Sequence, residues 1–307
     1  MIVAHQLTKQ FDTFAAVRGI SLEVPAGSVL ALLGPNGAGK TTTIRMLTSI
    51  LKPTSGWARV AGFDVVTQAE EVRRRVGVLT EHHGLYARMR SEEYLRYFGD
   101  LYGLEPQVTR ERSLHLLEQF GLADARDKRL GEYSKGMRQK LALIRVMLHD
   151  PDVLVLDEPT SAMDPVSVRA VRDAIESLRR EHRTILLCTH NLHEAEQLAD
   201  HIAIIRRGAI IELGTPAELK RKLLGPSVFE LRLTAPLNGL AAGLAERLDV
   251  VGQGETWIRY RTDEPEVNNP AIIAWLAERQ APVLGLAEVE RSLEDVYLQV
   301  VEANDAH

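Results

Sequence analysis

Short apolar runs alternate with stretches of helical periodicity along the first part of the chain. Runs of about five residues suit strands that are buried on both faces, which are typical of parallel sheets in α/β proteins. The chain holds four such runs: Val29–Leu33, Val76–Leu79, Val153–Leu156 and Thr184–Cys188. The pattern therefore predicts an α/β core built on a mostly parallel sheet.

A mainly helical stretch separates the second and third runs, from about Ser91 to His149. Its last helix places apolar residues on one face at the 3.6-residue period: Met137, Leu141, Ile144 and Leu148. The helix after Asp164 shows the same pattern at Val168, Val171, Ile175 and Leu178. We expect an inserted helical subdomain of about residues 88–149. The early strands Ile2–Leu7 and Ile20–Val24 alternate apolar and polar residues, which favours a small antiparallel part.

A change of charge marks a boundary near residue 225. Residues 1–225 carry 31 basic and 28 acidic side chains, whereas residues 226–307 carry 6 and 14, and the last lysine is Lys222. The turn signal Leu224-Gly225-Pro226 lies at the same place. We therefore expect one domain over residues 1–223 and a compact α+β domain over residues 226–307.

The second domain has the periodicity of a split βαβ unit. Its expected order is strand, helix, two strands, helix and strand: Val228–Leu233, Leu237–Arg247, Asp249–Val251, Thr256–Arg261, Pro270–Arg279 and Val283–Val289. A final helix is expected at Ser292–Val301, because Ser292 can cap it and Asp295 follows three residues later.

Composition and charge exclude several classes of function. A net charge of −5 gives no reason to expect a nucleic-acid partner, and the single cysteine, Cys188, rules out an internal disulfide. The N-terminal residues lack the long apolar run of a signal peptide, and no run approaches the ~18 apolar residues of a spanning helix. We expect a chain that does not cross a membrane by itself but can dock onto a protein that does.

The segment Gly34–Thr41 reads GPNGAGKT and follows an apolar strand directly. This is the phosphate-binding loop in its usual context between a strand and a helix. Glycines let the backbone turn tightly and point N–H groups at phosphate oxygens, and the helix that follows adds its positive end. Lys40 supplies a charge for the terminal phosphates, and the hydroxyl of Thr41 is a magnesium ligand.

Two further motifs carry chemistry. The run Val153–Pro159, VLVLDEP, delivers two carboxylates at the end of a buried strand, where α/β sheets bind ligands. We expect Asp157 to hold magnesium, through water, and Glu158 to orient and deprotonate the attacking water. The second motif is YSKGMRQK, in which Ser134 and Gly136 precede a helix. A hydroxyl and backbone N–H groups at the start of a helix suit a γ-phosphate. Taken alone, the motif would indicate only a capped basic helix.

Together these motifs, GPNGAGKTT, VLVLDEP and YSKGMRQ, resemble those of the ATP-binding cassette (ABC) ATPases over about residues 1–223. The resemblance implies that Asp164 lies in the D-loop, that His190 is the switch histidine contacting the γ-phosphate, and that Phe11 stacks on adenine. A ring packed under a loop is the alternative interpretation of Phe11. Glu81 stands where the family has glutamine, and the resemblance implies a catalytic and magnesium-binding position there.

The residues implied to bind nucleotide are Phe11, Gly34, Pro35, Asn36, Gly37, Ala38, Gly39, Lys40, Thr41, Thr42, Ser134, Gly136 and Asp164. Those implied in catalysis are Glu158, His190 and Glu81, and those implied to hold magnesium are Thr41, Asp157 and Glu81. The chain departs from the family signature LSGGQ at Lys135 and Met137. Three features resemble those of bacterial exporter ATPases for drugs, sodium or polysaccharide cargo: the form of the signature, Glu81 and the tail SLEDVYLQVV.

The resemblance implies an ATPase that binds two ATP molecules between two copies of the cassette, each site using the phosphate loop of one chain and Ser134 and Gly136 of the other. Either a homodimer or a heterodimer with a similar chain fits. Separate membrane permease subunits are implied as partners, which places the chain at the cytoplasmic face of the cell membrane, with export as the expected direction. The second domain is expected to stabilise the dimer or to gate the permease.

Two alternatives belong to other classes of protein. One is a soluble ABC ATPase acting on ribosomes or DNA, which the single cassette, the acidic tail and the absence of a long coiled coil disfavour. The other is a nucleotide sensor without enzymatic activity, which the presence of Lys40, Asp157, Glu158 and His190 disfavours.

Overall fold

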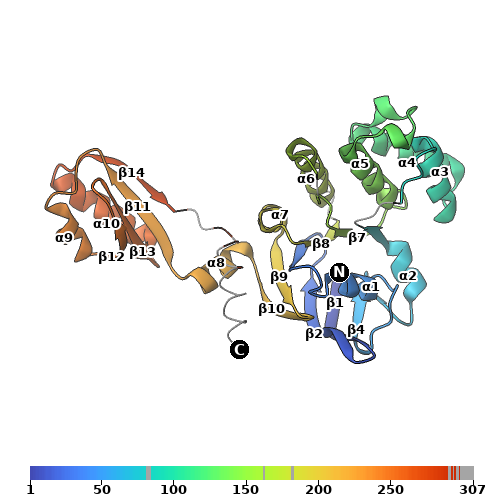
Figure 1. Ribbon diagram of the computed structural model, residues 1–307, viewed down its shortest axis with the longest axis horizontal. Helices are drawn as coiled ribbons and strands as arrows, with labels where there is room; N and C mark the ends of the chain where they lie inside the picture. Colours follow the sequence, from blue (N-terminus) through green and yellow to red (C-terminus); the bar gives the residue numbers. More distant parts are fainter. Residues whose placement is uncertain are drawn as a thin grey trace. The chain divides into compact units, whose positions relative to one another are not determined.

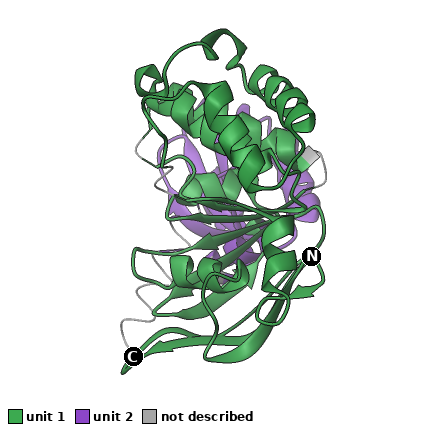
Figure 2. Cartoon of the chain, turned by 90° about the vertical axis from the view of Figure 1, so that its right-hand side faces the viewer, with its two compact units in different colours: residues 1–216 green, residues 217–307 purple. Residues whose placement is uncertain are grey.

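The computed structural model describes residues 1–80, 84–161, 163–180 and 183–289, with Ser292, Glu294 and Tyr297. The chain divides into two compact units, residues 1–216 and residues 217–307 (Figure 2). The division lies between Pro216 and Ala217, ahead of the boundary expected from the charge pattern. Each unit has its own hydrophobic core.

A six-stranded sheet forms the centre of unit 1, in the order β10-β9-β3-β8-β7-β6. Every neighbouring pair from β9 to β6 is parallel, and β10 pairs antiparallel with β9. The strands are β3 (Val29–Leu33), β6 (Val76–Leu79), β7 (Val153–Asp157), β8 (Thr184–Thr189), β9 (His201–Arg206) and β10 (Ala209–Gly214). The four strands predicted from apolar runs are confirmed, and every residue of β3, β7 and β8 is buried.

A second sheet of unit 1 is wholly antiparallel, as its alternating pattern predicted, and has the order β2-β1-β4-β5. Its strands are β1 (Ile2–Phe11), β2 (Phe14–Val24), β4 (Ser55–Val60) and β5 (Phe63–Asp64). Helix α1 (Lys40–Leu47) shares one core with both sheets, through Ile44, Met46 and Leu47. This packing holds the start of α1 in place behind the phosphate loop.

Helices α3, α4 and α5 gather at one end of unit 1 (Figure 1) and confirm the predicted helical stretch. Besides α1, the described helices of unit 1 are α2 (Ala69–Arg75), α3 (Ser91–Leu101), α4 (Pro106–Gln119), α5 (Lys135–Met147), α6 (Pro165–Arg180) and α7 (Leu192–Leu198), with 3₁₀ turns at Ala123–Ala125 and Leu130–Glu132. The predicted apolar face of α5 is buried at Leu141 and Ile144. No helix among the described residues has the length and apolar character needed to span a membrane.

Unit 2 confirms the predicted βαββαβ order, with an antiparallel sheet in the order β12-β13-β11-β14. Its elements are β11 (Ser227–Leu233), α9 (Leu240–Ala245), β12 (Asp249–Gln253), β13 (Trp257–Thr262), α10 (Pro265–Glu278) and β14 (Val283–Glu288), and they follow helix α8 (Pro216–Leu224), which begins at the last residue of unit 1. Leu231, Leu244, Ile258 and Leu276 form the centre of its core.

Two helix boundaries in unit 2 differ from the prediction. Helix α9 begins after Gly239, whose positive φ of 74° ends the preceding turn, so the helix is shorter than Leu237–Arg247. Helix α10 begins at Pro265 and contains Pro270, which the prediction had placed at its first position. Proline favours the first turn of a helix, and Pro265 is the one that occupies it. The helix predicted at Ser292–Val301 lies outside the described residues except at Ser292, Glu294 and Tyr297.

Because the two cores are separate, we predict that Leu231→Ala destabilises unit 2 alone. Leu231 is fully buried, so truncating it should cost about 2–5 kcal/mol through lost contacts and a cavity. Amide hydrogen exchange should become faster across β11–β14 and stay unchanged in β3 and β7. The exposed Val267→Ala change in the same unit should alter exchange little. Equal loss of protection in β3 and β7 would mean that the two units unfold together.

Candidate functional site

The phosphate loop opens into a pocket of about 280 Å³ at the carboxyl ends of β3 and β7. Its walls combine the loop, the start of α1 and the two acids at the end of β7, with two residues of β2; the lining residues are Phe14, Ala16, Pro35, Asn36, Gly37, Gly39, Lys40, Thr41, Thr42, Asp157 and Glu158. The structure thus brings most of the predicted phosphate-binding residues together with the two carboxylates. Gly34 and Ala38 are buried in the loop itself rather than in the pocket wall.

Backbone conformation explains why the loop needs glycine. Gly39 has a φ of 110°, and a Cβ atom there would lie 2.8 Å from the carbonyl oxygen of Ala16. Gly39 is also the N-cap of α1 and provides no side-chain cap for it. Since the first N–H groups of a helix lack intrahelical partners, the start of α1 is suited to bind an anion.

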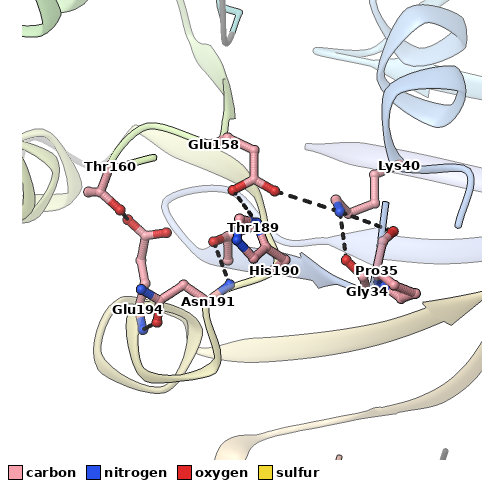
Figure 3. A network of polar contacts seen from close by, with 9 residues as sticks. All are labelled: Gly34, Pro35, Lys40, Glu158, Thr160, Thr189, His190, Asn191 and Glu194. Atoms are coloured by element: carbon pink, nitrogen blue, oxygen red, sulfur yellow. Dashed lines mark hydrogen bonds and ion pairs between the residues drawn. The ribbon is translucent and has the colours of Figure 1, made fainter. Parts of the chain in front are cut away.

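Lys40 is buried at the pocket floor, with 6% of its surface exposed. Its Nζ donates to the carbonyl oxygens of Gly34 at 2.6 Å and Pro35 at 3.4 Å, and lies 3.6 Å from Glu158 Oε1 (Figure 3). A buried ammonium group is costly unless it is paired, and these three contacts satisfy it. The positive charge is therefore held between the loop and the acid at the end of β7.

Glu158 has a left-handed backbone, with a φ of 50°. For a residue with a side chain this conformation costs about 1–3 kcal/mol, so the surroundings must hold it. Its backbone N–H donates to the carbonyl oxygen of Cys188 at 2.8 Å, and its Oε2 lies 2.8 Å from His190 Nδ1. Its buried Oε1 has no hydrogen-bond partner among the described residues.

Strand pairing brings His190 to the same place. Asp157 of β7 pairs with Cys188 of β8, and Leu33 of β3 pairs with Thr189. The residues that follow these three parallel strands therefore meet at one edge of the sheet. The His190 side chain is 57% exposed, whereas that of Glu158 is 11% exposed, so the imidazole covers the carboxylate from the solvent side.

A third carboxylate near the site, Glu194 of α7, was not predicted. It is fully buried, and the hydroxyl of Thr160 donates to its Oε1 at 2.7 Å (Figure 3). Burial raises the pKa of the Glu194 carboxyl, and the nearby Glu158 raises it further; the hydroxyls of Thr189 and Thr160 and the charge of Arg172 act in the opposite direction. No spacing in the sequence marks this contact.

The predicted nucleotide-binding residues Ser134, Gly136 and Asp164 also lie outside the pocket wall. Ser134 is exposed and caps α5, its Oγ accepting a hydrogen bond from the N–H of Met137 at 3.2 Å. Gly136 is buried where a Cβ atom would lie 2.6 Å from Ser167 Oγ, so α5 and α6 pack closely there. Asp164 caps the start of α6, and its hydrogen bonds to Ser167 lower the pKa of its carboxyl.

The predicted adenine-stacking residue, Phe11, is not part of the pocket wall, whereas Phe14 is. The two residues are backbone partners across the turn between β1 and β2, and the Lys9 ammonium lies 5.1 Å from the centre of the Phe11 ring. The role of Phe11 stays a prediction, and Phe14 is a second candidate that sequence reasoning missed. Glu81 lies outside the described residues.

Comparison with known proteins agrees with this geometry. The family model described as "ABC transporter" matches residues 17–161. The daunorubicin/doxorubicin resistance ATP-binding protein DrrA of Streptomyces peucetius is 40% identical over 95% of this chain and 89% of its own length. The Nod factor export ATP-binding protein I of Burkholderia pseudomallei is 37% identical over 96% of this chain and 95% of its own length.

Solved structures share the fold. The ATP-binding subunit of an ABC transporter superposes with a TM-score of 0.66 at 27% identity, covering 80% of this chain and 99% of that one. An ATP-binding cassette solved as a dimer in a post-hydrolysis state, with ADP and Pi, gives a TM-score of 0.63 at 20% identity, covering 70% and 98%.

The fold and the pocket are those of an ABC-type ATPase. The chain belongs to the ATP-binding proteins of ABC transporters and is an ATP-hydrolysing subunit. The relatives do not support the alternative of an ABC ATPase acting on ribosomes or DNA.

We predict that Gly39→Ala weakens ATP binding about tenfold or more, which corresponds to at least about 1.4 kcal/mol. The added methyl group would meet the Ala16 carbonyl oxygen at 2.8 Å and force the loop to move. Titration calorimetry with ATP measures the effect. Gly62→Ala is the matched control, because Gly62 also has a positive φ, 87°, but a Cβ atom there meets nothing within 4 Å. Equal affinities of the parent and Gly39→Ala chains would contradict the role of this close approach.

Proposed function

We propose that this chain dimerises around two ATP molecules and powers export through separate membrane permease subunits. The observation that carries the proposal is the set of contacts joining Lys40, Glu158 and His190 at the wall of the phosphate-loop pocket. A phosphate-binding cation, a carboxylate and an imidazole within contact distance are what hydrolysis of a nucleoside triphosphate requires.

Phosphate binding follows from the loop and Lys40. The uncapped N–H groups at the start of α1 and the positive end of the helix favour the phosphates of ATP. Phosphate oxygens can replace the carbonyl oxygens of Gly34 and Pro35 as acceptors for Lys40. Because Lys40 is already buried, little further desolvation accompanies this exchange.

The oxygen ligands in the pocket suit magnesium. Thr41 and Asp157 line the same wall, and a hydroxyl with a carboxylate matches the preference of this ion for oxygen donors. When bound, magnesium neutralises charge on the terminal phosphates. We propose Thr41 and Asp157 as its protein ligands, Asp157 through water, with Glu81 as a further position implied by the family resemblance.

Glu158 is the proposed general base. Its Oε1 lies 3.6 Å from Lys40 Nζ but has no hydrogen-bond partner among the described residues, so it can accept a proton from water while Oε2 stays in contact with His190 Nδ1. As the water oxygen forms a bond to the γ-phosphorus, the bond to the β-phosphate oxygen breaks, ADP leaves, and the water proton passes to Glu158. A protonated His190 donates from both ring nitrogens and can stabilise the charge on the transferred phosphate.

A second copy of the cassette is proposed to complete each site. Ser134 and Asp164 are exposed and lie outside the pocket of their own chain, as does the backbone around Gly136. These residues suit a γ-phosphate bound by another protomer, in a homodimer or a heterodimer. A cassette of the same fold has been solved as a dimer with ADP and Pi, which supports the proposal.

Export and the membrane partner are proposed from the relatives. DrrA is named for drug resistance and the Burkholderia protein for Nod factor export, and both alignments extend through most of unit 2. We propose that this chain likewise docks on permease subunits at the cytoplasmic face of the membrane and drives an outward step.

We predict that Glu158→Gln lowers kcat about a hundredfold or more, because the amide cannot accept the water proton. The same variant should accumulate as an ATP-bound dimer. Phosphate release measures the first effect, and light scattering after gel filtration with magnesium and ATP measures the second. Glu23→Gln, an exposed change outside the pocket, is the control. Hydrolysis by Glu158→Gln at the parent rate would remove Glu158 as the base.

A further inference from the structure

Two segments of unit 1 meet behind the pocket: residues 157–161, which follow β7, and residues 189–194, which follow β8. Side chains join them at two points, Glu158 to His190 at 2.8 Å and Thr160 to Glu194 at 2.7 Å (Figure 3). A backbone hydrogen bond from Glu158 N–H to the carbonyl oxygen of Cys188, the residue just before the second segment, adds a third contact. Only the first side-chain contact involves groups assigned to the reaction.

We propose that Glu194 is a positioning residue for ATP hydrolysis. Through its hydrogen bond to Thr160, it fixes the segment that carries Glu158 against the segment that carries His190. The inference rests on the proposed function and deepens it, because it names the residue that keeps Glu158 and His190 at contact distance.

The contact between Glu158 and His190 does not fix this geometry by itself. More than half of the His190 side chain is exposed, so water competes for its hydrogen bonds. Glu158 also has a strained, left-handed backbone that relaxes unless it is restrained. Glu194 provides the restraint from the buried side through its hydrogen bond with Thr160, which lies two residues after Glu158.

Glu194 itself is held rigidly. Asn191 caps α7 by accepting the N–H of Glu194 at its Oδ1, at 3.1 Å, and the N–H of Asn191 donates to Thr189 Oγ1 at 3.0 Å. Ala195 and Leu198 anchor the helix in the core. A movement of His190 is therefore transmitted through a capped turn to Glu194, and from there to Thr160.

Packing alone does not account for a carboxyl group at this position. Glu194 is fully buried, and no partner of its Oε2 is found in the described part of the chain. A buried polar oxygen without a hydrogen bond is destabilising, so an apolar side chain would stabilise this core better. Two hydroxyls, of Thr189 and Thr160, act on this carboxyl, and that of Thr160 lies on the segment that carries the base.

A double-mutant cycle on the full chain tests the proposal. Thr160→Val and Glu194→Ala should each lower kcat about five- to fiftyfold while the KM for ATP stays within about twofold. The double variant should be no slower than the slower single variant, because both changes break one interaction. Thr160→Ser and Glu194→Gln keep a donor and an acceptor, and both should retain kcat within about threefold.

Thr262→Val is the matched control for loss of a buried hydroxyl. Thr262 and Thr160 are each 7% exposed, and Thr262 accepts a hydrogen bond from Asn268 in unit 2. Its loss should lower the unfolding midpoint without changing kcat. Additive losses of kcat in the double variant, failure of Glu194→Gln to restore turnover, or a raised KM with unchanged kcat would overturn the proposal.

An independent readout separates this inference from the proposed function. The imidazole nitrogen resonances of His190 should shift in Thr160→Val and Glu194→Ala but not in Glu194→Gln. A shift in a chain without ATPase activity would overturn the proposed function and support the positioning role. An unchanged His190 signal in all variants would overturn the positioning role, whatever the turnover.

Discussion

Backbone pairing between β3, β7 and β8 is the constraint on which the site depends. Their register places Leu33 beside Thr189 and Asp157 beside Cys188, so the residues that follow each strand emerge at one edge. Lys40, Glu158 and His190 come from positions far apart in the sequence and meet because of this alignment. A slip of one residue in any of the strands would turn its side chains to the other face and separate the three groups.

The charges of the site are arranged around a single buried cation. Lys40 is paired by two carbonyl oxygens and one carboxylate, and that carboxylate also contacts His190. Breaking such a buried pair from one side leaves an uncompensated charge, so each partner restrains the other. The left-handed backbone of Glu158 is part of the same arrangement, because it turns the carboxylate away from the strand direction and toward the phosphate loop.

Local patterns in the sequence predicted four of the six strands of the central sheet, the phosphate loop and the βαββαβ order of unit 2, because each depends on residues close together in the chain. The contact between Thr160 and Glu194 could not be predicted, since it joins two loops across a strand pair and has no fixed spacing. Phe14 was missed because only the folded β1–β2 turn distinguishes it from Phe11. Gly136 was predicted only as part of a phosphate receptor, and its close packing against Ser167 depends on how α5 meets α6.

The single cysteine has a practical consequence. Cys188 is fully buried in β8, and burial, with the neighbouring Asp157 and Glu158, raises the pKa of its thiol well above the usual range. Thiol-reactive reagents modify the thiolate, so the native chain should give almost no background labelling. Fluorophores or spin labels can therefore be attached to cysteines introduced at the surface while β8 keeps its natural residue, which makes movements between subunits accessible to spectroscopy.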